Sequence, residues 1–143
     1  MKKILSVDDD EDQTYTIKRQ LERIGDFEVD GVDSGEKCIE WLRNNGKPDL
    51  ILLDIMMPGM NGWQVFKVLR KHDDWNEIPI VFLTARTDSF SKGFGKIISE
   101  AYIEKPFDVD HLKNKIDEVL SHPFQLSETK RKIIDDMMEK AIK

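Results

Sequence analysis

Short strand-like runs alternate with amphipathic stretches along the first 121 residues. The runs at 50–53 and 78–83 are apolar throughout, and the others lie at 3–7, 27–32 and 101–104. A short run that is apolar throughout is typical of a strand buried on both faces, as in a parallel sheet. Because each run is followed by a helical pattern, the chain predicts an α/β fold: a doubly wound, five-stranded parallel sheet with five helices.

Each predicted helix has one apolar stripe. The stripes are Ile17, Leu21 and Ile24 in the first helix; Cys38, Ile39 and Leu42 in the second; Val65, Phe66, Val68 and Leu69 in the third; Phe90, Phe94, Ile97 and Ile98 in the fourth; and Leu112, Ile116, Val119 and Leu120 in the fifth. Asp33 and Glu36 have the spacing of a capping box at the start of the second helix. Cys38 is predicted to be a small core residue rather than a reactive thiol.

A last amphipathic segment follows the break at Pro123. Its apolar pairs recur every four residues between positions 133 and 142, and Ser127 could cap a helix there. We expect an extra, sixth helix over 127–143 that packs on its own domain or on a second copy of the chain, as a homodimer would. The alternative is a disordered, solvated tail. The predicted division is therefore a domain over 1–121 and a helical extension over 122–143.

Composition excludes several classes of protein. The net charge of −6 and the absence of a long Lys/Arg cluster argue against direct nucleic-acid binding. No stretch approaches the roughly 18 apolar residues of a membrane span. A single cysteine excludes an internal disulfide and suits a reducing cytoplasm, so a cytoplasmic protein is expected.

Polar residues whose side chains could bind a ligand or take part in a reaction lie where the predicted strands end. Asp8 and Asp9 follow the first strand, Asp54 ends the third, Thr84 follows the fourth and Lys105 the fifth. The carboxyl ends of strands lie on one rim of a doubly wound sheet, so these residues should meet. Three clustered carboxylates would have raised pKa values unless a cation lay among them, and oxygen ligands of this kind favour Mg²⁺.

The ordered set of residues, with the stretch from Asp54 to Gly62, resembles the receiver domain of two-component response regulators, chemotaxis regulators among them, over about residues 2–121. The resemblance implies a flavodoxin-like sheet of order 2-1-3-4-5. It also assigns roles: Asp54 as the phosphoacceptor, Asp8, Asp9, Asp54 and the backbone carbonyl of Met56 as Mg²⁺ ligands, Lys105 as the phosphate-binding lysine, and Thr84 and Tyr102 as switch residues. The Lys105–Pro106 bond of such domains is usually cis.

The resemblance further implies a phosphorelay switch rather than an enzyme in the ordinary sense. Its phosphoryl group would come from a sensor histidine kinase or a phosphotransfer protein, and its output would be a downstream protein target. One alternative is a haloacid-dehalogenase-type phosphatase, with Asp8 as nucleophile and Asp10 as acid/base, although that family's downstream acidic motif is missing. Another is an interaction module with a vestigial site, which predicts no Mg²⁺-dependent fluorescence change from Trp41, Trp63 or Trp75.

Overall fold

The computed structural model describes residues 1–85, 102–121 and 136, without the side chains of Thr84, Ala85 and Tyr102. Its strands are β1 (Lys2–Val7), β2 (Phe27–Val32), β3 (Leu50–Asp54), β4 (Ile80–Ala85) and β5 (Tyr102–Lys105). Its helices are α1 (Glu11–Ile24), α2 (Gly35–Asn45), α3 (Gly62–Lys71) and α5 (Val109–Ser121). All neighbouring strands are parallel, in the order β2-β1-β3-β4-β5, which confirms the predicted sheet.

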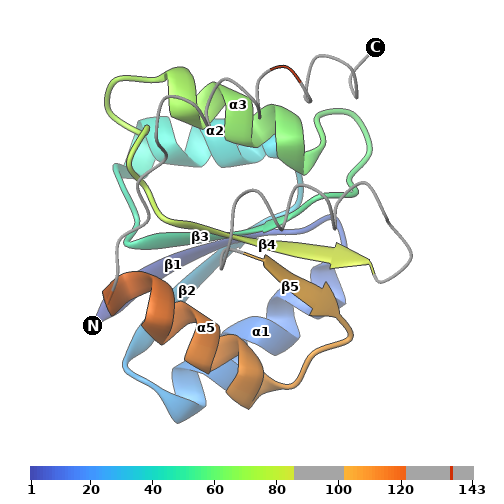
Figure 1. The fold of residues 1–143 in the computed structure, drawn as a ribbon, viewed down its shortest axis with the longest axis vertical. Helices are drawn as coiled ribbons and strands as arrows, with labels where there is room; N and C mark the ends of the chain where they lie inside the picture. The colour runs from blue at the N-terminus through green and yellow to red at the C-terminus, as the bar shows by residue number, and fades with distance from the viewer. Residues whose placement is uncertain (86–101, 122–135, 137–143) are drawn as a thin grey trace.

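The sheet lies between two helical layers, with α2 and α3 on one face and α1 and α5 on the other (Figure 1). Successive side chains of a strand point to opposite faces, and β3 shows the result. Ile51 and Leu53 join the core beneath α2 and α3, whereas Leu50 and Leu52 join the core beneath α1 and α5. Because both faces of β3 are covered, its sequence is apolar throughout until Asp54.

In the described helices, two residues of the predicted stripes lie outside the core. Ile24 and Val68 are both exposed over more than a third of their surface. Ile24 is the last residue of α1, directly before the Gly25 C-cap. Val68 lies to the side of the face that Val65, Phe66 and Leu69 bury. Helical spacing alone does not show where a neighbouring layer ends.

Strand and helix starts also shift slightly. β4 begins at Ile80 instead of residue 78, because Pro79 has no N–H for the ladder and the Ile78 N–H donates to the Trp75 carbonyl. The prediction of a capping box between Asp33 and Glu36 is wrong. The Ser34 hydroxyl caps α2 by accepting a hydrogen bond from the Lys37 N–H at 3.1 Å. Asp33 instead pairs with the Lys37 ammonium at 3.0 Å.

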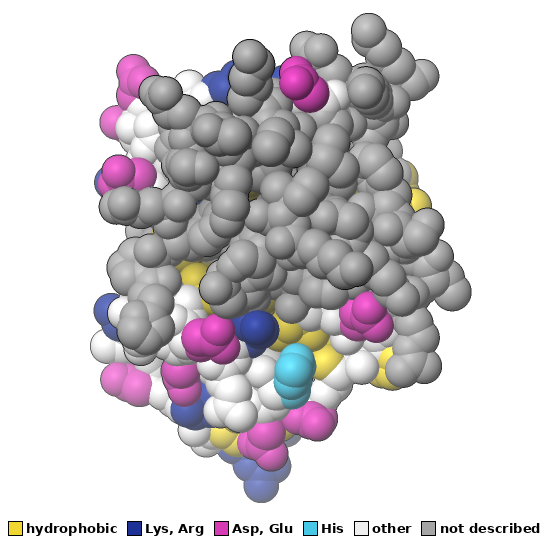
Figure 2. All heavy atoms as spheres, viewed as in Figure 1, with side chains coloured by type: hydrophobic (Ala, Val, Ile, Leu, Met, Phe, Trp, Pro, Cys, Tyr) yellow, Lys and Arg dark blue, Asp and Glu magenta, His cyan; other side chains and the backbone are white. Residues whose placement is uncertain are grey.

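Cys38 is fully buried in the core beneath α2, as predicted. Burial raises the pKa of its thiol to about 12, so almost no thiolate forms near neutral pH. On the described part of the face in Figure 2, acidic and basic side chains are interspersed. Among the described helices, none has the length and apolarity to cross a bilayer. The expected fourth helix and the expected helix over 127–143 fall outside the described residues, except for Asp136, which is helical.

Candidate functional site

Asp54 ends the central strand, and its position follows from the apolar run before it. Residues 50–53 must be buried on both faces, so the strand carries Asp54 to the carboxyl edge of the sheet. There the backbone of Asp54 lies opposite Leu83 of β4, and its side chain is only 7% exposed. Ligands of open α/β folds bind at this edge of the sheet, so the Asp54 carboxylate is placed where it can contact one.

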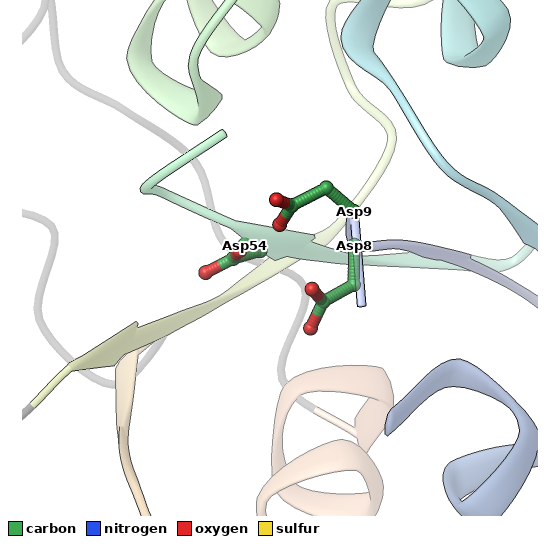
Figure 3. A group of neighbouring side chains, drawn as sticks. All are labelled: Asp8, Asp9 and Asp54. Atoms are coloured by element: carbon green, nitrogen blue, oxygen red, sulfur yellow. The ribbon is translucent and has the colours of Figure 1, made fainter. Parts of the chain in front are cut away.

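Asp8 and Asp9 reach the same point from β1. Val7 pairs with Leu53, so the residues after Val7 emerge beside Asp54. Asp8 is buried and Asp9 is exposed, and carboxylate oxygens of the three residues all lie within 4.8 Å of one another. Figure 3 shows this grouping, with Asp54 at the end of β3 and the other two just after β1. The structure therefore brings together the three acidic residues predicted to meet.

Lys105, the last residue of β5, supplies the positive charge. Its Nζ lies 2.9 Å from Asp8 Oδ2 and 3.4 Å from Asp54 Oδ1. Both contacts fit the expectation that the strand ends meet, and the shorter of the two is with Asp8. The Lys105–Pro106 peptide bond is cis, as the resemblance implied.

The charges at this edge are not balanced. Burial is the largest cause that raises the pKa of Asp54, to about 7, and the charge of Asp8 adds to it, although Lys105 works in the opposite direction. Burial tends to lower the pKa of Lys105, but the carboxylates of Asp8 and Asp54 outweigh it and the pKa is raised. Among the side chains that the structure describes, three carboxylates face one ammonium, so a further cation would stabilise the ionised cluster.

A hard divalent cation fits this set of atoms. Three carboxylates converge, and Asp9 leaves one side open to water, as Mg²⁺ requires because it keeps several water ligands. Met56 lies in the turn directly after β3 and is 61% exposed. A hard cation prefers oxygen to the soft thioether sulfur, so the backbone carbonyl of Met56 is the atom that suits it.

The two predicted switch residues are placed by their backbones alone. Thr84 of β4 pairs with Glu104, one position beyond the Leu83 that faces Asp54. Tyr102 begins β5 opposite Phe82. Their side chains lie outside the described part of the chain, so their roles stay predictions.

Asp10 does not serve as the acid/base of a phosphatase. Its carboxylate caps α1, accepting from the N–H groups of Asp12 at 3.0 Å and Gln13 at 3.2 Å. Its own N–H donates to Asp8 Oδ1 at 2.9 Å. Asp10 thus holds the β1–α1 turn in place, and it does not join the cluster that Asp54 forms with Asp8 and Asp9.

Gly62 ends the stretch that carries the resemblance, and it is the first residue of α3. In the structure its N–H donates to the Ile55 carbonyl at 2.9 Å, and it packs against the backbone of Asp54. The dipeptide Asn61-Gly62 indicates a helix start, but it carries no sign of this long-range approach.

Comparison with known proteins gives one consistent result. The response regulator receiver domain family matches residues 4–117. Protein PilH of Pseudomonas aeruginosa is 33% identical over 122 residues, covering 85% of this chain and 99% of PilH. The solved receiver domain of Francisella response regulator 1452 is 29% identical with a TM-score of 0.72, covering 85% of this chain and 98% of that one.

Other relatives are longer than the region that matches. The transcriptional regulatory protein YvrH of Bacillus subtilis is 38% identical over 127 residues, which cover 88% of this chain but only 52% of YvrH. The chain thus spans nearly all of one relative and about half of the other. None of these relatives supports the phosphatase alternative, which the role of Asp10 also contradicts. By these matches and by its sheet, the chain belongs to the response regulator receiver domain family.

Proposed function

We propose that Asp54 accepts a phosphoryl group from the phosphohistidine of a sensor histidine kinase or of a phosphotransfer protein. Response regulators accept phosphate from sensor kinases, and receiver domains are signalling switches rather than classical enzymes. The observation that carries the assignment is that Asp54 alone combines three properties. It ends the central strand, lies beside the acidic pair of β1, and contacts Lys105.

The transfer is a nucleophilic substitution at phosphorus. A carboxylate oxygen of Asp54 attacks, the P–N bond to the histidine breaks, and the imidazole leaves with the bonding electrons and takes up a proton. Lys105, whose Nζ is 3.4 Å from Asp54 Oδ1, can move with the incoming phosphoryl group and donate to one of its oxygens. Later, a water molecule attacks the acyl phosphate, which releases inorganic phosphate and restores the carboxylate.

The Asp54 carboxyl group must be ionised in order to attack phosphorus. Its surroundings in the folded chain favour the protonated form instead. Burial and the charge of Asp8 raise the pKa of Asp54 to about 7. Receiver domains bind Mg²⁺ at acidic residues of this kind, and we assign Asp8, Asp9, Asp54 and the Met56 carbonyl as its ligands here. When bound, Mg²⁺ would neutralise the cluster and bind a phosphoryl oxygen.

The proposal extends to the signal that leaves the site. Phosphate on Asp54 would attract the Thr84 hydroxyl, and the space this frees would let Tyr102 turn inward, which makes a two-state switch read by a downstream protein target. We assign this role to the domain over 1–121, acting in the cytoplasm, and we treat 122–143 as a helical extension. YvrH is a transcriptional regulatory protein, but the match covers only 52% of it. Control of transcription is therefore not part of this proposal.

Acetyl phosphate labelling followed by peptide mass spectrometry tests the acceptor. We expect one phosphoryl group on Asp54, only in the presence of Mg²⁺, and none on the Asp54→Asn variant. Asp49→Asn is a suitable control, because Asp49 accepts from the Lys3 N–H at the opposite end of β3. Equal labelling of Asp54→Asn would refute the assignment, and loss of label on Asp8→Asn alone would favour the phosphatase.

Tryptophan fluorescence tests the alternative of a vestigial site. Trp63 packs against Phe82 with ring centroids 4.6 Å apart, and it follows Gly62 directly. Mg²⁺ binding at Asp54 should therefore alter its emission. An emission spectrum that Mg²⁺ leaves unchanged would favour an interaction module over a phosphoryl switch.

A further inference from the structure

We propose that Gly62 is a positioning residue for the metal site, because it holds the turn after β3, and with it the Met56 carbonyl, against Asp54. The inference rests on the proposed Mg²⁺ site. The turn covers residues 55–61, between the end of β3 and the start of α3. One of its backbone carbonyls is assigned to the metal, so the path of the turn determines whether that ligand is in place.

Gly62 lies against backbone, not against side chains. A Cβ at this position would stand 2.5 Å from the Asp54 carbonyl oxygen, 2.8 Å from the Ile55 Cα and 3.1 Å from the Asp54 carbonyl carbon. Backbone of a strand buried between two neighbours cannot move aside. A side chain at position 62 would therefore push the turn and the first residue of α3 away from Asp54.

Two sets of hydrogen bonds close the turn around this contact. The Gly62 N–H donates to the Ile55 carbonyl at 2.9 Å. Asn61 and Gln64 form a capping box: the Gln64 N–H donates to Asn61 Oδ1 at 2.9 Å, and the Asn61 N–H donates to Gln64 Oε1 at 2.8 Å. The start of α3 is thereby fastened to the residue that follows Asp54.

The requirement at position 62 is for space rather than for backbone freedom. Gly59, in the same turn, has a φ of +71°, a value that favours glycine whatever its neighbours are. Gly62 is the first residue of α3 and is not among the glycines with positive φ. Alanine would suit the helix itself, so the effect of Gly62→Ala isolates the close approach to Asp54.

A displaced turn matters for this metal in particular. Mg²⁺ demands nearly ideal octahedral geometry with ligand distances of about 2.0–2.1 Å, so a small displacement of one carbonyl weakens binding. Residues that only orient a ligand commonly account for about 10–100-fold in metal affinity. The expected effect of Gly62→Ala is of that size.

Gly25 provides a control far from the site. It is the C-cap of α1, just before β2 begins, and its φ of −146° does not demand glycine. A Cβ there would meet the Phe27 ring carbons Cε2 and Cδ2 and, at 3.5 Å, the Lys113 Cε. These are side-chain atoms at the amino end of the strands, opposite the edge that holds Asp54. Gly25→Ala should therefore cost stability without weakening Mg²⁺ binding.

The experiment is calorimetric titration of the 143-residue chain with Mg²⁺, with urea unfolding in EDTA measured alongside. We expect Gly62→Ala to weaken Mg²⁺ binding by at least about tenfold and Gly25→Ala by less than about twofold, whatever their relative stabilities. The Ile55 amide resonance should also shift in Gly62→Ala. A folded Gly62→Ala variant that binds Mg²⁺ within about twofold of the wild type would overturn the inference.

A second variant covers the case in which Gly62→Ala does not fold. Asn61→Ala removes the capping box but adds no atoms, and it should weaken Mg²⁺ binding severalfold. Wild-type affinity in Asn61→Ala would then count against the role of the turn. A wild-type chain that binds no Mg²⁺ would contradict the proposed function itself, and so the two failures are distinguishable.

Discussion

Replacing Asp54 by Asn should make the metal-free protein more stable at pH 8 and leave its stability nearly unchanged at pH 4. The buried carboxyl group must give up its proton beside Asp8, with only partial compensation from Lys105, which contacts both carboxylates. Asn has a similar shape and no charge. The substitution therefore removes the cost of ionising Asp54 in the folded state.

The size of the effect follows from the pKa. A rise from 3.8 to about 7 corresponds to at most about 4 kcal/mol, at about 1.4 kcal/mol for each pKa unit. Because the site opens to solvent at the edge of the sheet, screening reduces such energies, and we expect about 2 kcal/mol.

The sign depends on pH in a defined window. The pKa of Asp54 is higher in the folded chain than in the unfolded chain, so the folded state holds the proton more tightly. Its contribution to stability is fully present below about pH 4, declines as the pH rises, and is lost above about pH 7. The advantage of Asp54→Asn should grow across the same window and then level off.

Urea unfolding in EDTA, followed by tryptophan fluorescence at several pH values, gives the two free energies of unfolding. Asp117→Asn is the control, because it removes an exposed carboxylate that pairs with Lys113 on α5. That variant should differ from the wild type by less than about 1 kcal/mol. The reasoning is refuted if Asp54→Asn gains nothing at pH 8, or if its gain is the same at pH 4.

Mg²⁺ should reverse the order of stabilities. At a concentration a hundred times its dissociation constant, a ligand stabilises the folded state by about 2.7 kcal/mol, which exceeds the roughly 2 kcal/mol expected from the substitution. The wild type would gain this energy and Asp54→Asn would gain less, since it lacks one of the proposed ligands. A reversal on adding Mg²⁺ would connect the cost of ionisation to the metal site in a single measurement.

Four further outcomes are expected. Lys105→Arg should accept phosphate but bind a downstream partner several-fold less well, because a planar guanidinium cannot follow a small movement as an ammonium can, and partner-binding titrations check this. Thr84→Ala should be phosphorylated at Asp54 by acetyl phosphate yet lose the response to it in the same titrations. The Cys38 thiol should react with Ellman's reagent only in denaturant, since burial raises its pKa to about 12. Truncation after Ser121 should lower helicity per residue in circular dichroism, whereas unchanged helicity and a protease-sensitive tail would indicate disorder.

The sheet was predictable because both of its faces are covered. A strand such as Leu50–Asp54 has no polar face, so its apolar run and the carboxylate that ends it can be recognised in the sequence. The order of the strands came from the resemblance, whereas the meeting of Asp8 and Asp54 at one edge was predicted from the parallel sheet itself. Both are properties of the backbone path.

What escaped prediction depends on distances that no local pattern contains. Asp33 and Ser34 both can accept a hydrogen bond, and only the backbone decides that Ser34 caps α2. The ammonium of Lys105 lies nearer to Asp8 than to Asp54, and this depends on how its side chain crosses two strands. The approach of Gly62 to Asp54 likewise appears only when β3 and α3 are placed together.

The strand order also has a consequence for the newly made chain. β1 pairs with both β2 and β3, so the acidic residues can be assembled as soon as the first half of the protein has left the ribosome. Lys105 comes about 50 residues after Asp54, a delay of roughly 3–10 s at common rates of synthesis. During that interval, the nascent protein depends on protons or divalent ions from its surroundings to balance the acidic cluster.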